Sequence, residues 1–143
     1  NLPAAEVASQ SAFQLDGKHS TDQVATNDLI TITAGVRFTP PEPVLAGMVV
    51  VDVAVPTGFA PETTSIEALA KQTARLKRWD IAGRKVLFYI EEMQPNEAIP
   101  LTSQARALFP VRAQAVASQA YAYYRPEWRG EHLSTRVVVS SRS

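Results

Sequence analysis

Short stretches of alternating apolar and polar residues recur along most of this chain, and prolines or glycines separate them. Three of the clearest are residues 29–38, 48–55 and 85–90, which are rich in Val, Ile, Thr and aromatic residues. These residue types favour β-strands, and alternation with a period of two places every second side chain on one face. Pro40 and Pro56 follow the first two stretches, and proline cannot donate to a sheet ladder. We therefore predict three strands, and one face of the second holds Val49, Val51, Val53 and Val55.

Further strands are predicted at residues 76–81, 99–109, 113–124 and 133–139, where similar alternation returns. Turn residues lie between successive segments, as is typical of an antiparallel sandwich. A parallel sheet needs a long crossover, usually a helix, between its strands, and only one helix is indicated. The expected fold class is therefore mainly β, an antiparallel β-sandwich with one short α-helix.

The single helix is predicted to begin at Ser65 and to end near Leu76. Its apolar residues keep helical spacing and form one stripe that can be buried, namely Ile66, Leu69, Ala70 and Leu76. The run Thr64-Ser65-Ile66-Glu67 fits a capping box, in which Glu67 reaches back to the cap amide. Because so short a helix is marginal in water, packing against the sheet must hold it.

The chain divides into an entry segment and one domain. Residues 1–27 are weakly patterned and rich in Ala, Ser and Gln, so they form a linker, an edge segment with one short strand near Phe13, or a disordered arm. Residues 28–143 are long enough to bury a core of their own. The chain begins with Asn1 rather than Met, which is typical of a processed chain or of a domain excised from a longer parent.

Composition narrows the classes of function. The chain has 143 residues, of which 45% are hydrophobic and 20% charged, as in ordinary globular proteins. Its formal net charge is +0 and its basic residues are scattered, which argues against nucleic-acid binding. No apolar run approaches the ~20 residues that span a bilayer, so no membrane insertion is expected. The absence of cysteine excludes disulfides, thiolate zinc sites and cysteine nucleophiles.

The sequence contains no recognisable catalytic constellation. His19 and His132 lie near opposite ends of the chain in polar surroundings, and we interpret both as solvated surface residues. Asp16, His19 and Asp22 lack the spacing of a calcium loop, so their segment is interpreted as a polar loop. Nucleophile elbows, glycine-rich phosphate loops and His-Glu-x-x-His motifs are missing. We therefore expect no catalytic, cofactor-binding or metal site, and no enzyme.

Aromatic residues gather near the C-terminus, at Tyr121, Tyr123, Tyr124 and Trp128. They are interpreted either as packing of a late strand or as an anchor for a partner. The second interpretation supports an alternative function, a stand-alone adhesion or carbohydrate-binding β-sandwich with these rings as its platform. A buried Trp128 in the free domain would count against that alternative.

Two motifs, in order along the chain, carry a resemblance to a known family. Residues 51–61 read Val-Asp-Val-Ala-Val-Pro-Thr-Gly-Phe-Ala-Pro, and the predicted helix and an aliphatic strand at 86–90 follow them. Residues 121–124 read Tyr-Ala-Tyr-Tyr. With its motifs in this order, the chain resembles the C-terminal receptor-binding domain of the alpha-macroglobulins, over roughly residues 28–124, which is most of its length.

The resemblance implies a β-sandwich with one helix across its edge, at the end of a very large multidomain protease inhibitor. Alpha-macroglobulins trap proteases when a bait region is cut and the molecule collapses around the protease. The expected function is therefore that of a C-terminal domain that packs against neighbouring macroglobulin domains and becomes exposed for recognition after bait cleavage. The other partners that the resemblance implies are a protease and a cell-surface receptor, and the expected location is extracellular or periplasmic.

The resemblance also points to the helix as a partner-binding site. In vertebrate members, a receptor with an acidic pocket recognises two lysines four residues apart on this helix. The corresponding positions here are Thr63 and Glu67, whereas Lys71 and Arg75 offer a cationic pair at the same spacing one turn later. These four residues are the candidate partner-binding residues. Because the lysines and the disulfide of the vertebrate members are missing, a bacterial relative is favoured.

Overall fold

The computed structural model describes residues 10–114, 116–134 and 136–141, which form strands and one helix. In chain order the elements are β1 (Gln10–Ser11), β2 (Phe13–His19), β3 (Gln23–Ala25), β4 (Leu29–Phe38), β5 (Met48–Ala54), β6 (Phe59–Pro61), α2 (Thr63–Gln72), β7 (Leu76–Ala82), β8 (Lys85–Glu91), β9 (Ala98–Ala107), β10 (Val111–Ala113), β11 (Ala117–Ala122), β12 (Arg125–Leu133) and β13 (Val137–Ser140).

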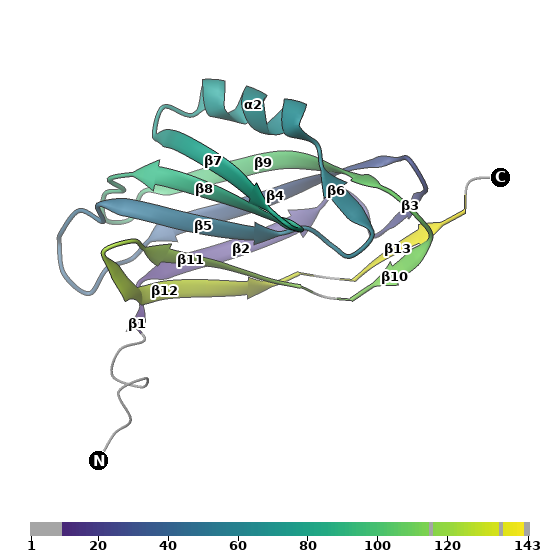
Figure 1. Ribbon diagram of the computed structural model, residues 1–143. Helices are drawn as coiled ribbons and strands as arrows, with labels where there is room; N and C mark the ends of the chain where they lie inside the picture. Colours follow the sequence, from purple (N-terminus) through teal and green to yellow (C-terminus); the bar gives the residue numbers. More distant parts are fainter. Residues whose placement is uncertain (1–9, 115, 135, 142–143) are drawn as a thin grey trace, which may run out of the picture.

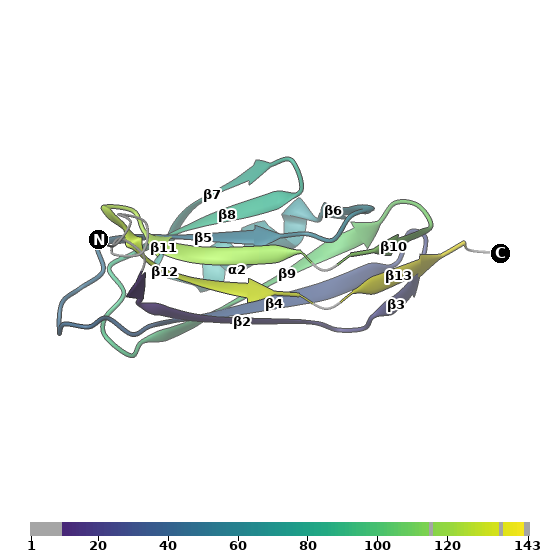
Figure 2. The same cartoon turned by 90° about the horizontal axis from the view of Figure 1, so that it is seen from below.

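Two sheets lie face to face, as Figures 1 and 2 show. The six-stranded sheet has the order β1-β12-β11-β5-β8-β7, and the four-stranded sheet has the order β2-β4-β9-β6. A three-stranded sheet, β10-β13-β3, extends the end of the molecule that carries the C-terminus. Most neighbouring strands are antiparallel, except that β1 runs parallel to β12 and β13 parallel to β3. The predicted antiparallel β-sandwich with one helix is confirmed.

The core lies between the two large sheets, where the alternating residues of the sequence meet. Val49, Val51 and Val53 of β5 are each at most 4% exposed, as their shared face predicts. The rings of Phe38 and Trp128 lie 6.1 Å apart between their centroids and join the two sheets. This core belongs wholly to the described residues, so the domain buries its own apolar surface.

Helix α2 is shorter than predicted at its C-terminal end. Ile66 and Leu69 are buried as expected, but Thr73 is already extended, and Leu76 begins β7 instead of ending the helix. Leu76 is buried as predicted, but it can be buried in a strand as well as in a helix. The apolar spacing alone therefore placed the C-terminal end of the helix too late. The predicted capping box is wrong: Glu62 occupies the N-cap without a side-chain hydrogen bond to the helix.

The turn between β5 and β6 explains the glycine of the Gly-Phe-x-Pro motif. Gly58 has a φ of 88°, in the left-handed region that favours glycine. A Cβ atom there would lie 2.6 Å from Cγ1 of Val111, so a larger residue also lacks space. This turn delivers Phe59 into the core, where it is 2% exposed.

The described part of the entry segment contributes to both large sheets. Residues of β1 pair with β12, and the chain then crosses to the other sheet, where β2 pairs with β4 from Phe13 to His19. At the crossing, Gly130 lies so close to the Phe13 carbonyl oxygen that a Cβ atom would be 2.2 Å from it. The division of the chain at residue 28 stays a prediction.

Candidate interaction surfaces

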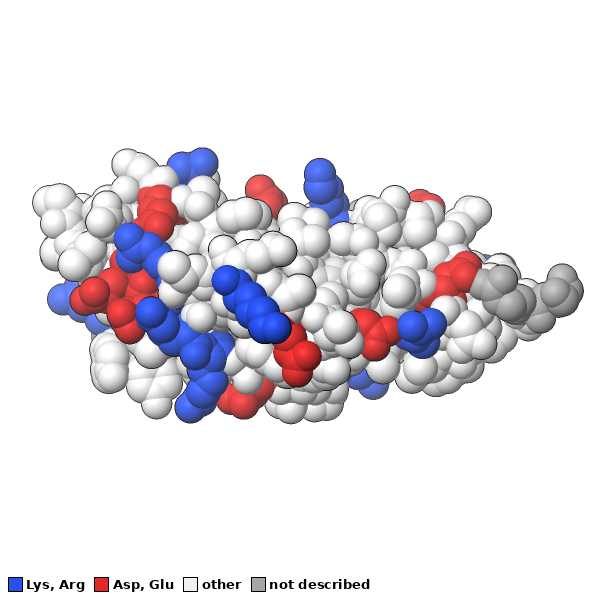
Figure 3. All heavy atoms as spheres, turned by 90° about the horizontal axis from the view of Figure 1, so that it is seen from above, with Lys and Arg blue, Asp and Glu red and all other residues white. Residues whose placement is uncertain are grey.

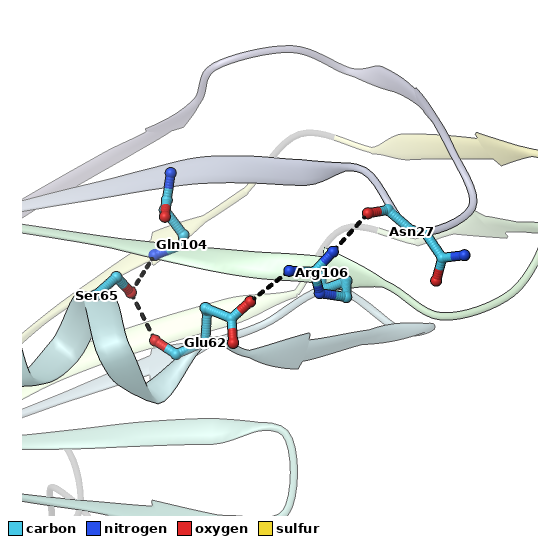
Figure 4. A network of polar contacts seen from close by, with 5 residues as sticks. All are labelled: Asn27, Glu62, Ser65, Gln104 and Arg106. Atoms are coloured by element: carbon cyan, nitrogen blue, oxygen red, sulfur yellow. Dashed lines mark hydrogen bonds and ion pairs between the residues drawn. The ribbon is translucent and has the colours of Figure 1, made fainter.

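The N-terminal end of α2 is tied to β9 by a polar network, drawn in Figure 4. The Ser65 hydroxyl accepts a hydrogen bond from the Gln104 amide at 2.9 Å and donates to the Glu62 carbonyl at 2.6 Å. The Glu62 amide donates to the Gln104 carbonyl at 2.8 Å. The Glu62 carboxylate pairs with Arg106 at 2.9 Å, and Arg106 donates to the Asn27 carbonyl at 2.8 Å. Both main-chain groups of Gln104 are thus satisfied by the helix entry.

Beyond the other end of α2, Arg75 connects three segments. Its Nε atom lies 2.9 Å from a carboxylate oxygen of Glu97. Its guanidinium also donates to the main-chain carbonyls of Glu91, at 3.3 Å, and of Glu92. Arg75 therefore holds the start of β7 against the turn that follows β8.

Between these two anchors, a groove of about 780 Å³ separates α2 from the edge of β9. The helix contributes one stripe with spacing i, i+3, i+4 and i+7, made of Ser65, Ala68, Leu69 and Gln72. The strand contributes a row that includes Ala98, Pro100 and Thr102. Of the described residues that line the groove, only Arg75 and Glu97 are charged, and they pair with each other.

Three of the four predicted partner-binding residues lie on α2, and the fourth lies beyond its end. Thr63, Glu67 and Lys71 are exposed and lie four residues apart along α2. Arg75 lies after the helix end and is engaged by Glu97, so it makes no cationic pair with Lys71 on a shared helix face. Figure 3, which views the molecule from the side of α2, shows acidic and basic side chains interspersed.

The outer face of the six-stranded sheet carries a row of tyrosines and arginines. The strand register places Arg78, Tyr89, Val50, Tyr121 and Arg129 side by side across five strands. The guanidinium carbon of Arg78 lies 4.2 Å from the Tyr89 ring centroid, and that of Arg129 lies 5.6 Å from the Tyr121 ring centroid. Burial raises the pKa of the Tyr121 phenol, and the neighbouring Tyr89 and Asp52 add to this effect.

The next row of this face holds a buried carboxylate that the sequence analysis did not single out. Asp52 is 6% exposed, and its Oδ2 atom lies 3.3 Å from Nζ of Lys85 and 3.5 Å from Nε2 of Gln119. Its Oδ1 atom has no hydrogen-bond partner among the described residues. The signal in the sequence was a lone acidic residue inside a run of valines, at a position facing away from the core.

The aromatic cluster near the C-terminus divides between the core and the surface. Trp128 is 4% exposed and packs on Phe38, so it cannot serve as a platform for a sugar. Tyr123 and Tyr124 are 54% and 77% exposed, and their rings meet edge to face at 5.0 Å. Burial of Trp128 counts strongly against the carbohydrate-binding alternative.

The two histidines, distant in the sequence, meet where β2 passes β12. Both line one small cavity, and the His132 ring lies against Gly17. Burial, and then the nearby His132, lowers the pKa of His19. The expectation of two separate solvated residues is therefore wrong. Among the described residues, no three His, Asp or Glu side chains are grouped so that they could hold a metal. The described part of the chain also contains no helix that is long and apolar enough to span a bilayer.

Comparison with known proteins gives a consistent result. The family model described as the A-macroglobulin receptor binding domain matches residues 45–133. Among solved structures, a fragment of native Escherichia coli alpha-2-macroglobulin from domain MG7 to the C-terminus aligns with a TM-score of 0.76 at 14% identity, over 91% of this chain and 24% of that one. Salmonella alpha-2-macroglobulin reacted with methylamine aligns with a TM-score of 0.75 at 15% identity, over 91% of this chain and 9% of that one.

Trypsin-activated alpha-2-macroglobulin from Escherichia coli aligns with a TM-score of 0.76 at 15% identity, over 92% of this chain and 10% of that one. No curated protein matches the sequence. The chain spans a quarter or less of the length of these solved structures. At such low identity they show a shared fold, whereas the family model covers more than half of the chain. The chain therefore belongs to the alpha-macroglobulin receptor-binding domain family.

Proposed function

We propose that this chain is the C-terminal domain of an alpha-macroglobulin-like protease-trapping inhibitor, and that its location is extracellular or periplasmic. Its role is binding rather than catalysis, and its main partners are the neighbouring macroglobulin domains of the parent chain. Family membership and the small share of each solved relative that the chain spans support this role.

The observation that carries the proposal is the outer face of the six-stranded sheet. Tyr and Arg are enriched at protein interfaces and supply most strong contact residues. Here a tyrosine–arginine face, defined as Arg78, Tyr89, Tyr121 and Arg129 with the adjoining Tyr123 and Tyr124, joins both residue types on a sheet surface. Tyr124 is 77% exposed in this domain. Because an aromatic ring contributes most to binding energy when it is buried, such a ring is suited to being covered by a partner. We assign this face to domain–domain packing.

Tyrosine modification tests this assignment. Nitration of Tyr123 and Tyr124 by tetranitromethane is compared in the isolated domain and in the parent inhibitor, with mass spectrometry as the readout. We expect slower nitration of both residues in the parent, because a neighbouring domain covers them. Equal rates in the two proteins would show that this face is not an interdomain contact.

The outward side of α2 is a second candidate surface, for recognition after bait cleavage. Its exposed residues Thr63, Glu67 and Lys71 offer one hydroxyl, one negative and one positive charge. Acetylation of Lys71 in the parent, before and after cleavage by a protease, measures whether the helix becomes accessible. We expect faster acetylation after cleavage, and an unchanged rate would remove the helix from this role.

A further inference from the structure

The edge of β9 that faces α2 is paired over only part of its length. Strand β6 pairs with β9 from Ala105 to Ala107. The entry of the helix then satisfies Gln104 through Ser65 and Glu62. From Ala98 to Thr102 no strand of the described residues lies on this side, because β4 occupies the opposite edge and β6 pairs only from Ala105 to Ala107.

The direction of the unpaired groups follows from the ladder. Gln104 turns both its N–H and its C=O toward the helix, and main-chain groups of a strand alternate between its two edges. Thr31 of β4, which lies opposite Gln104, turns its main-chain groups away from β9. Its N–H donates to the Ser20 hydroxyl and its carbonyl accepts from the Ser20 amide, each at 2.9 Å. Thr102 and Ala98 therefore direct an N–H and a C=O into the groove, whereas Pro100 directs only a C=O, because proline has no N–H.

These groups are accessible. Ala98, Pro100 and Thr102 are exposed, and the helix wall opposite them includes the small side chain of Ala68. The groove volume of about 780 Å³ lies within the range of about 300–1,000 Å³ typical of ligand sites. Five extended residues span about 17 Å at ~3.4 Å per residue.

The charges around the groove are already balanced. Arg75 pairs with Glu97 at one end, and Glu62 pairs with Arg106 beyond the other. The lining between them is made of hydroxyl, amide and small apolar side chains. A charged side chain of a ligand would lose water here without gaining an opposite charge, so an uncharged occupant is favoured.

We propose that this groove binds one extended, uncharged polypeptide segment of a partner protein by addition of a β-strand to β9. The unpaired groups recur every second residue, about 6.8 Å apart, which is the spacing of main-chain groups in an extended chain. Strand addition of this kind uses main-chain hydrogen bonds for affinity and flanking side chains for selectivity. The inference concerns the edge of β9 alone and does not depend on the proposed packing of the tyrosine–arginine face.

Pro100 limits the affinity of the groove for such a segment, because it lacks one main-chain donor. Proline on an edge strand removes one donor and reduces unspecific pairing with other chains. Pro100→Thr restores that donor within the groove. A net hydrogen bond of ~0.5–1.5 kcal/mol corresponds to about 2- to 12-fold in a dissociation constant.

The probe is an acetylated, amidated pentapeptide that alternates threonine and valine, titrated to millimolar concentration into the isotopically labelled domain. We expect amide shifts and slower hydrogen exchange at Thr102 and Ala98, and tighter binding to Pro100→Thr. A peptide with proline at its second and fourth positions, and one that alternates lysine and glutamate, are expected to bind more weakly. Absence of changes at Thr102 and Ala98 in both the wild-type domain and Pro100→Thr would overturn the proposal.

Two variants separate the groove from other surfaces. Ala68→Arg fills the groove and is expected to abolish the shifts, whereas Lys71→Ala on the outward side of α2 leaves them unchanged. Binding that survives Ala68→Arg in a folded domain would contradict the proposal. Sedimentation of the domain without peptide completes the test. If the domain forms a dimer in which the Thr102 amide is already protected, the occupant of the groove is a second copy of the chain. That result would refute the proposal that a partner protein supplies the segment.

Discussion

The groove beside β9 and the tyrosine–arginine face of the six-stranded sheet offer different chemical groups to a partner. In the groove, main-chain groups of Thr102 and Ala98 face no partner strand among the described residues, and the side chains between the Arg75–Glu97 pair and the helix entry are uncharged. On the face, β5 and β8 each lie between two strands that pair with them, so a partner meets side chains such as Tyr89 and Arg78. A strand edge can therefore bind partner segments of many sequences, provided that they are extended. The face of a sheet instead selects a partner by the shape and charge of its side chains.

The largest expected effect concerns the core at β6, next to the entry of α2. Phe59→Ala removes a side chain that is 2% exposed, at the start of the strand that leads into α2. Truncating a buried phenylalanine costs ~3–5 kcal/mol. Urea unfolding of the two domains measures the difference. A loss below ~1 kcal/mol would mean that the end of the groove at β6 is not anchored in the core.

On the face, the pair of Lys85 and Asp52 is expected to show strong coupling. Lys85→Ala should cost ~1–2 kcal/mol, because it leaves the buried Asp52 carboxylate without its cation, although Lys85 itself is half exposed. In the Asp52→Val background the same change should cost about zero. Equal costs in the two backgrounds, measured by urea unfolding, would show that Asp52 does not depend on Lys85.

An effect of similar size distinguishes Lys71 from Arg75, the two cations that the sequence analysis paired. Arg75→Ala is expected to cost ~1–2 kcal/mol, because Arg75 bonds two main-chain carbonyls and Glu97. Lys71→Ala is the matched control, and change at such an exposed position stays within ~0.5 kcal/mol. Thermal unfolding of both variants makes the comparison. Equal losses of stability in the two variants would show that the contacts of Arg75 contribute no more than an exposed surface residue does.

The smallest effect lies away from both surfaces, at the histidine pair. Since the pKa of His19 is lowered in the folded state, the unfolded chain binds a proton first as the pH falls. Stability should therefore be unaffected by His19 above its ordinary pKa of 6.5 and should decrease as the pH falls below it. His19→Gln should flatten this part of the pH profile of unfolding. An unchanged profile would show that His19 does not titrate differently on folding.

Much of the fold could be predicted because β-branched alternation is a local property. The strands around Ile32, Val51 and Phe88 lie where their period of two placed them. Trp128 could be interpreted as core or as a platform from its sequence surroundings alone. Only its position against Phe38, from a strand of the other sheet, decided between these interpretations.

The candidate groove could not be predicted, because its parts are distant in the sequence. Ser65 and Gln104 are 39 residues apart, and Arg75 and Glu97 also come from separate elements. No local pattern reports which strand edge stays unpaired, since that depends on where β6 ends its pairing with β9. The capping box failed because the helix begins earlier than its sequence suggests: Glu62 takes the cap position, so Thr64, the first residue of the predicted box, already lies inside α2.

By itself, the sequence determined the class of this domain: alternating strands, one helix with a buried stripe, no cysteine chemistry, and the motif at residues 51–61 that carries the family resemblance. These features depend on residue type and on neighbours along the chain. Tertiary structure alone decided that Arg75 is an anchor, that Asp52 is buried, that His19 meets His132, and that an edge of β9 stays open. Each of these depends on which strands become neighbours in space, and that is settled by the packing of the whole core.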